Sequence, residues 1–159
     1  MTFDNSKTII GFRIKIFILT VIFLAYLILA YFAELIPFPL LGLDDAYWTL
    51  MLSVIWVTAA LLPMILNFQF VFFSDDTENI VFRYFNAGIF GGKKNAVEID
   101  KRLFAGYTTE KKMFGQMISI TLYQKFNDGV AKYPPIYISA LSKQEKMRLF
   151  KILNTYSAS

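Results

Sequence analysis

A long stretch of this chain, from Ala46 to Ser74, contains no charged residue. A bilayer core of about 30 Å needs only about 20 helical residues, so the stretch is too long for one simple membrane helix. Its first part is rich in Leu, Ala and Met, whereas its tail is aromatic and partly alternating. We therefore expect a transmembrane helix over Tyr47–Asn67 that passes directly into a β-strand at Phe68–Phe73.

A second uncharged run, Ile16–Ala33, is long enough to span a bilayer and is bracketed by Lys15 and Glu34. A cleaved signal peptide is the alternative, because a basic segment precedes the apolar core. That core is longer than usual, and bulky Tyr31 and Phe32 stand where a cleavage site needs small residues. We therefore expect two membrane helices in a hairpin.

The basic residues are distributed unevenly around this hairpin. Lys7, Arg13 and Lys15 precede it, none lies in Ile16–Asn67, and the rest of the 16 follow Asn67. The connecting loop, Glu34–Tyr47, contains Pro and Gly but neither Lys nor Arg. By the positive-inside rule, the N-terminus and the C-terminal part are expected in the cytoplasm and the loop outside.

From Phe68 onward the apolar period changes from that of a helix to that of a strand, which predicts an antiparallel sheet domain. Gly106 is a candidate bulge, and Asp128-Gly129 suits a hairpin turn. Ser142 and Glu145 form a capping box that opens an amphipathic C-terminal helix. The predicted domains are the leader and hairpin, residues 1–67, and a cytoplasmic domain, residues 68–159.

Six or seven antiparallel strands followed by one helix resemble a pleckstrin-homology (PH)-like barrel. With two membrane spans directly before it, the chain resembles the bacterial membrane-anchored PH-domain proteins often labelled YcxB-like. The residues that carry the resemblance are the hairpin to Asn67, the immediate strand FQFVFF, and the ending PPIYISALSKQEKMRLFKILN. It implies a membrane α+β fold, with a two-helix hairpin and a small β-barrel closed by one C-terminal helix. It also implies a multi-pass protein of the bacterial inner membrane and a non-enzymatic role.

The sequence offers little chemistry of its own. It contains no Cys and no His, which removes thiol nucleophiles, thiolate metal sites and imidazole bases. Asp75 and Asp76 are adjacent in a turn, and Glu98 and Asp100 share one strand face without further ligands. We therefore expect no enzymatic activity, no metal, no cofactor and no nucleic-acid partner.

Two sets of residues are candidate contact sites. The second helix carries a small or polar stripe that could pack on the first helix or on another subunit. This stripe consists of Thr49, Ser53, Trp56, Ala60 and Asn67. Three basic pairs could touch anionic headgroups: Lys93-Lys94, Lys101-Arg102 and Lys111-Lys112.

The expected function is that of an accessory or structural subunit, which docks to a larger membrane protein complex through its hairpin, its sheet domain or both. The alternative is a membrane-tethered module whose basic loops read anionic lipid. The expected partners are the lipid bilayer and another membrane protein.

Overall fold

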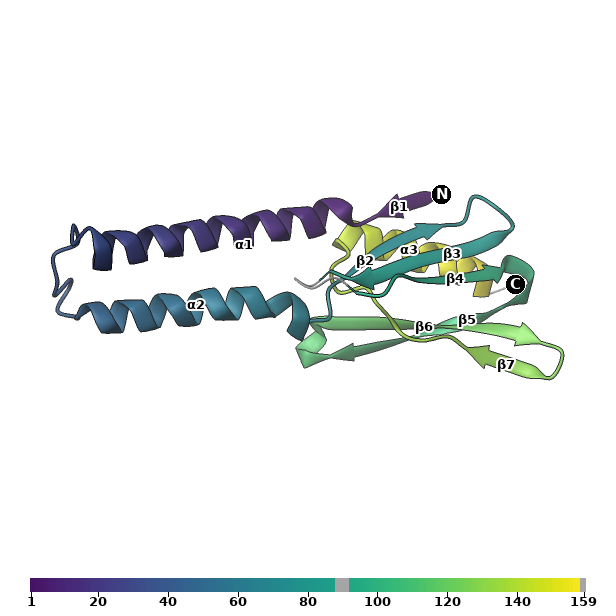
Figure 1. Ribbon diagram of the computed structural model, residues 1–159. Helices are drawn as coiled ribbons and strands as arrows, with labels where there is room; N and C mark the ends of the chain where they lie inside the picture. Colours follow the sequence, from purple (N-terminus) through teal and green to yellow (C-terminus); the bar gives the residue numbers. More distant parts are fainter. Residues whose placement is uncertain (88–91, 158–159) are drawn as a thin grey trace. The chain divides into compact units, whose positions relative to one another are not determined.

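The computed structural model describes residues 1–87 and 92–157 (Figure 1). It divides the chain into two compact units. The sheet unit combines Met1–Ile9 with Met64–Ser159, and the helical unit is Ile10–Pro63. The expected domains are residues 1–67 and 68–159. In the structure the sheet unit begins at Met64 and also includes Met1–Ile9.

The helical unit contains most of α1 (Ser6–Leu27), a π-helical turn η1 (Ile28–Phe32) and most of α2 (Asp45–Ile65), whereas the start of α1 and the end of α2 belong to the sheet unit. Both long helices have the length and composition needed to cross a membrane. Pro63 lies within the last turn of α2, where it removes one backbone donor.

The first helix begins ten residues before the uncharged run at Ile16, because hydropathy marks a membrane core and not a helix start. Lys and Arg are good helix formers, so the basic segment continues the helix. Its first turn is capped by Asp4, whose carboxylate accepts the backbone N–H of Ser6 at 2.9 Å.

The strands form two antiparallel four-stranded sheets. The first has the order β1 (Thr2–Asp4), β2 (Gln69–Ser74), β3 (Asn79–Asn86) and β4 (Asn95–Asp100). The second contains β5 (Phe104–Lys112), β6 (Met117–Phe126) and β7 (Gly129–Lys132), and β8 (Ile136–Tyr137) also pairs with β6. The short 3-10 turns η2 (Lys101–Leu103) and η3 (Met113–Gly115) follow β4 and β5.

The expected closed barrel is wrong for the described strands, because no ladder joins the two sheets. The turn η2 interrupts the extended chain between β4 and β5. Asp100 holds this turn by accepting the backbone N–H of Arg102 at 2.8 Å. The terminal helix is readable from sequence, but which strands pair is not.

The expectation that Phe68–Phe73 is the first strand is also wrong, since β1 precedes it and pairs with β2. The side chain of Phe3 packs on the core, with its ring centroid 5.3 Å from that of Phe73. Three residues are too few to show an alternating pattern, and the pairing is made across more than sixty residues of intervening chain.

One buried cluster joins both sheets and the C-terminal helix α3 (Lys143–Ser157). Leu149 and Leu153 of α3 are fully buried, and Phe150 stacks on Tyr107 of β5 with ring centroids 5.8 Å apart. The predicted capping box is confirmed: the Glu145 N–H donates to Ser142 Oγ at 3.2 Å and the Ser142 N–H to Glu145 Oε2 at 2.6 Å. The helix therefore begins where the sequence predicts.

The predicted bulge at Gly106 is confirmed by a register shift between Phe104 and Gly106 in the β5–β6 ladder. Gly106 has a φ of +116°, which side chains rarely tolerate.

Candidate functional site

The predicted stripe on α2 carries polar side chains that are paired within the helical unit. Thr49 Oγ1 lies 3.0 Å from the Tyr26 hydroxyl and 2.7 Å from the Tyr31 hydroxyl. The indole N–H of Trp56 donates to Thr20 Oγ1 at 2.9 Å, and its ring stacks on Phe23 at 5.9 Å. The structure thus brings Thr49 and Trp56 against α1 and its π-helical extension.

The remaining members of the stripe lie in different surroundings. Ser53 is half-buried and Ala60 is buried. Asn67 lies beyond the end of α2 and has a left-handed φ of 48°, a conformation that Asn tolerates after a helix. Its Nδ2 donates to Met117 Sδ at 3.4 Å, so the Asn67 side chain contacts β6.

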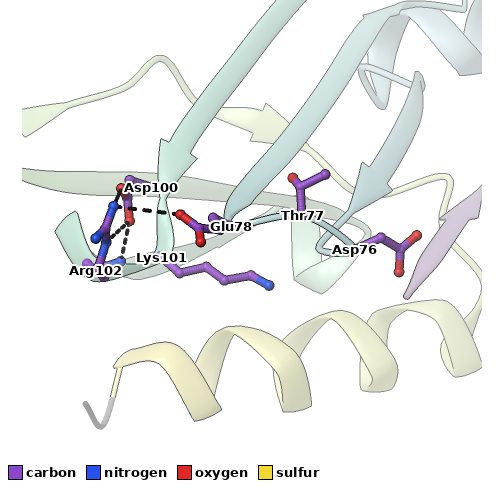
Figure 2. A pocket seen from close by; sticks show the side chains of 6 residues that line it. All are labelled: Asp76, Thr77, Glu78, Asp100, Lys101 and Arg102. Carbon is purple, nitrogen blue, oxygen red and sulfur yellow. Dashed lines mark hydrogen bonds and ion pairs between the residues drawn. The ribbon is translucent and has the colours of Figure 1, made fainter.

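The basic pair Lys101-Arg102 lines a groove of about 550 Å³ in the sheet unit (Figure 2). The guanidinium of Arg102 donates to both carboxylate oxygens of Asp100, at 3.1 and 2.7 Å, and lies 3.8 Å from Glu78. The ammonium of Lys101 donates to the Asp75 backbone carbonyl at 2.7 Å and lies over the Tyr156 ring. Both charges of this pair are therefore engaged within the chain.

The carboxylates of the same region are also engaged. The Arg102 hydrogen bonds lower the pKa of Asp100 to about 2. The N-terminal ammonium of Met1 donates to Asp75 and to Asp76. The bond to Asp76 lowers the pKa of that carboxyl group. Both pKa shifts favour the ionised form of these carboxylates.

Lys93 and Lys94 are exposed, and Lys94 borders a groove of about 400 Å³ over the outer face of β2–β4. This face carries Phe70 and Phe85, whose stacked ring centroids lie 4.8 Å apart. The guanidinium of Arg83 lies 5.9 Å from the centroid of the Phe72 ring on the same face. Sequence reasoning missed this aromatic face, although phenylalanines at alternate positions of FQFVFF signal it.

Lys111 and Lys112 end β5 at the turn that leads into β6. This turn exposes Met113 and Phe114, and Phe114 is fully exposed. Sequence reasoning chose the two lysines but not the apolar pair beside them. The signal was available, because a Met-Phe-Gly sequence between two strands places large apolar side chains in a loop.

A buried polar network lies at the end of the sheet unit that contains both helix ends. Asn5 Nδ2 donates to the Gln69 carbonyl at 2.9 Å, and its Oδ1 accepts the Val71 N–H at 2.9 Å. The Gln69 side chain joins Asn86 at 3.0 Å and the Tyr137 N–H at 2.9 Å. This network ties the start of α1 to both sheets. We call this end of the sheet unit the junction end; a small apolar cluster of Ile9, Phe68, Ala87 and Ala140 also belongs to it.

No group of three or more acidic side chains able to hold a metal ion lies within residues 1–87 and 92–157. In comparisons with known proteins, no protein-family model, no curated protein and no solved structure matches the chain.

Proposed function

We propose that the chain is a membrane-anchored, non-enzymatic accessory subunit, whose hairpin of α1 and α2 lies in the bilayer. The observation that carries the proposal is the outward surface of the two helices. The large apolar side chains exposed on the helices include these ten: Phe17, Ile18, Val21, Ile22, Leu24, Leu50, Val54, Ile55, Val57 and Leu61.

The size of this surface favours lipid over water. Burying a Leu, Ile or Phe side chain contributes about 1.5–3 kcal/mol, so ten half-exposed side chains amount to on the order of 10 kcal/mol. That equals the whole stability of a typical domain. Lipid around the hairpin removes this cost, because its acyl chains are as apolar as the side chains that meet them.

The polar groups of the helices support the same environment, since several of them find partners inside the helical unit. Trp56 and Thr49 bond across the hairpin, and Thr58 Oγ1 donates to the carbonyl of Val54 at 2.7 Å. Unpaired donors are costly in hydrocarbon, so internal pairing is the arrangement that a bilayer requires.

The charge distribution supports an orientation with the N-terminus and the sheet unit in the cytoplasm of a bacterium and the loop Glu34–Tyr47 outside. The resemblance to membrane-anchored PH-like proteins of the inner membrane is part of this proposal. The order of strands followed by one capping helix supports it.

The accessory role rests on the surfaces that the chain leaves open. The charges of the Lys101-Arg102 groove are paired internally, which favours a structural part over catalysis. The aromatic outer face of β2–β4, which contains Phe70 and Phe85, and the outward sides of the helices remain open to another membrane protein.

Purification of the full chain from native membranes in mild detergent tests this role. We expect a partner in stoichiometric amount, which Phe85→Glu on the aromatic face or Val57→Asp on α2 weakens. Lys125→Glu, an exposed position on β6, is the matched control and keeps the partner. A chain that purifies alone and yields no crosslinked partner in native membranes contradicts the accessory role.

The second candidate function is recognition of anionic lipid by basic loops, which the exposed β5–β6 turn favours.

A further inference from the structure

The β5–β6 turn presents apolar side chains to its surroundings in an unusual backbone conformation. Met113, Phe114 and Gly115 have φ values of +50°, +56° and +85°. Non-glycine residues rarely adopt this left-handed region, and Phe seldom does so on a surface. The conformation holds Phe114 fully exposed and Met113 about half exposed. The chain thus keeps two large apolar groups outside its core at a sterically disfavoured turn.

The turn lies at the junction end of the sheet unit. Its closing strand pair is Lys112 with Met117. The sulfur of Met117 accepts the side-chain N–H of Asn67, which follows the last residue of α2, Ile65, by two positions. The turn is therefore held close to the point where α2 ends, inside one compact unit.

The charges at the turn are positive in sum. Lys111 and Lys112 precede the apolar pair and are exposed. Lys112 lies 3.3 Å from Glu110, whereas Lys111 has no ion-pair partner among the described residues. Lysines beside exposed aromatic and Met side chains form the combination that binds at a bilayer surface: the apolar groups enter the acyl boundary and the ammonium groups meet anionic headgroups.

We propose that the Lys111–Gly115 turn is a membrane-contacting finger, in which Phe114 and Met113 insert at the lipid interface and Lys111 binds a headgroup phosphate. This inference rests on the proposed insertion of the hairpin, since insertion brings the end of α2 to the interface. We assign lipid as the molecule that contacts the turn. An inserted α2 ends at the bilayer surface near Ile65, so the bilayer reaches the turn without any partner protein. Contact at this second point restrains the orientation of the sheet unit on the membrane.

Because the chain lacks cysteine, single-cysteine variants of the full chain give unique labelling sites. Phe114→Cys reports the finger, Val57→Cys reports the outward face of α2, and Asn127→Cys, exposed in the β6–β7 turn, is the matched control. Each variant carries an environment-sensitive fluorophore and is reconstituted in nanodiscs of phosphatidylcholine and phosphatidylglycerol, with and without brominated acyl chains.

We expect blue-shifted emission and bromolipid quenching at positions 114 and 57, and water-like, unquenched emission at position 127. Lys111→Ala with Lys112→Ala should reduce the quenching at position 114 in anionic discs and leave it unchanged in discs of phosphatidylcholine alone. High salt should act like the double variant, because at 1 M the screening length falls to about 3 Å.

Two results distinguish failure of the finger proposal from failure of the anchor, by which we mean the membrane-inserted hairpin of α1 and α2. Quenching at position 57 with water-like emission at position 114 overturns the finger and leaves the anchor intact. Absence of quenching at position 57 overturns the anchor, and the finger with it. A label at position 114 that is shielded from iodide in native membranes, yet is unquenched in nanodiscs, assigns the turn to a protein partner and overturns lipid contact.

Discussion

Asn5 is the residue whose replacement most directly tests how the start of α1 is joined to the sheets. Its side chain is buried, donates to the Gln69 carbonyl and accepts the Val71 N–H, each at 2.9 Å. In Asn5→Ala both backbone groups lose this partner in a site closed to water. Each buried unpaired group costs about 1–3 kcal/mol, so we expect the sheet unit to lose about 2–6 kcal/mol of unfolding free energy.

Hydrogen exchange at the Val71 amide of the reconstituted full chain measures this loss locally. If the Val71 amide exchanges through unfolding of the whole sheet unit, a loss of 2 kcal/mol corresponds to about thirtyfold faster exchange. Asn154→Ala is the matched control, because Asn154 is exposed and accepts one bond, from the Tyr107 hydroxyl at 2.7 Å. We expect this control to change stability by less than about 1 kcal/mol.

Two results would contradict this role of Asn5. One is an exchange rate at Val71 that is the same in Asn5→Ala as in the control. The other is a loss of protection in Asn5→Ala that is confined to Met1–Asp4, since the network is held to support both sheets and not only the edge strand β1.

Three further changes test other parts of the fold. Leu149→Ala should cost about 2–5 kcal/mol because this side chain is fully buried, and Met147→Ala, largely exposed in the same helix, should cost far less in the same chemical-denaturation assay. Ser142→Ala should cost about 1 kcal/mol and raise hydrogen exchange in the first turn of α3, by loss of the cap. Arg102→Ala should return the pKa of Asp100 from about 2 toward its ordinary value near 3.8, as followed by carboxyl chemical shifts. Because this folded-state pKa is lowered, the pair stabilises the chain above about pH 4, and this contribution is lost as the pH falls toward 2.

Elements with a strong local pattern were predictable from the sequence. The two apolar helices, the change of period after Asn67 and the capping box at Ser142 each depend on neighbours in the chain. For the same reason the bulge at Gly106 could be predicted, since glycine marks the backbone conformation that a bulge needs.

Features that depend on distant pairing were not predictable. The strand β1 exists because Phe3 reaches the ring of Phe73, and no local pattern in three residues encodes that contact. The turn η2 lies between β4 and β5, and Asp100 and Arg102 hold it by a local hydrogen bond. That local interaction does not reveal that β4 and β5 belong to two separate sheets.

The candidate sites divide in the same way. Lys111 and Lys112 are exposed, whereas the charges of Lys101 and Arg102 are engaged by Asp75 and Asp100, and residue type alone could not show this difference. Pairing of that kind is set by where the strands end. It can be read from coordinates and not from a charge pattern.

In the proposed topology, the hairpin crosses a membrane and leaves the sheet unit on the cytoplasmic side. Labelling of single cysteines with a membrane-impermeant maleimide in intact cells tests it most directly, with Leu35→Cys in the loop and Asn127→Cys in the sheet unit, both at exposed positions. We predict that position 35 is labelled in intact cells with the outer membrane opened, and that position 127 is labelled only after the inner membrane is permeabilised. Labelling of position 127 in intact cells, or of neither position before permeabilisation, would contradict the proposed topology.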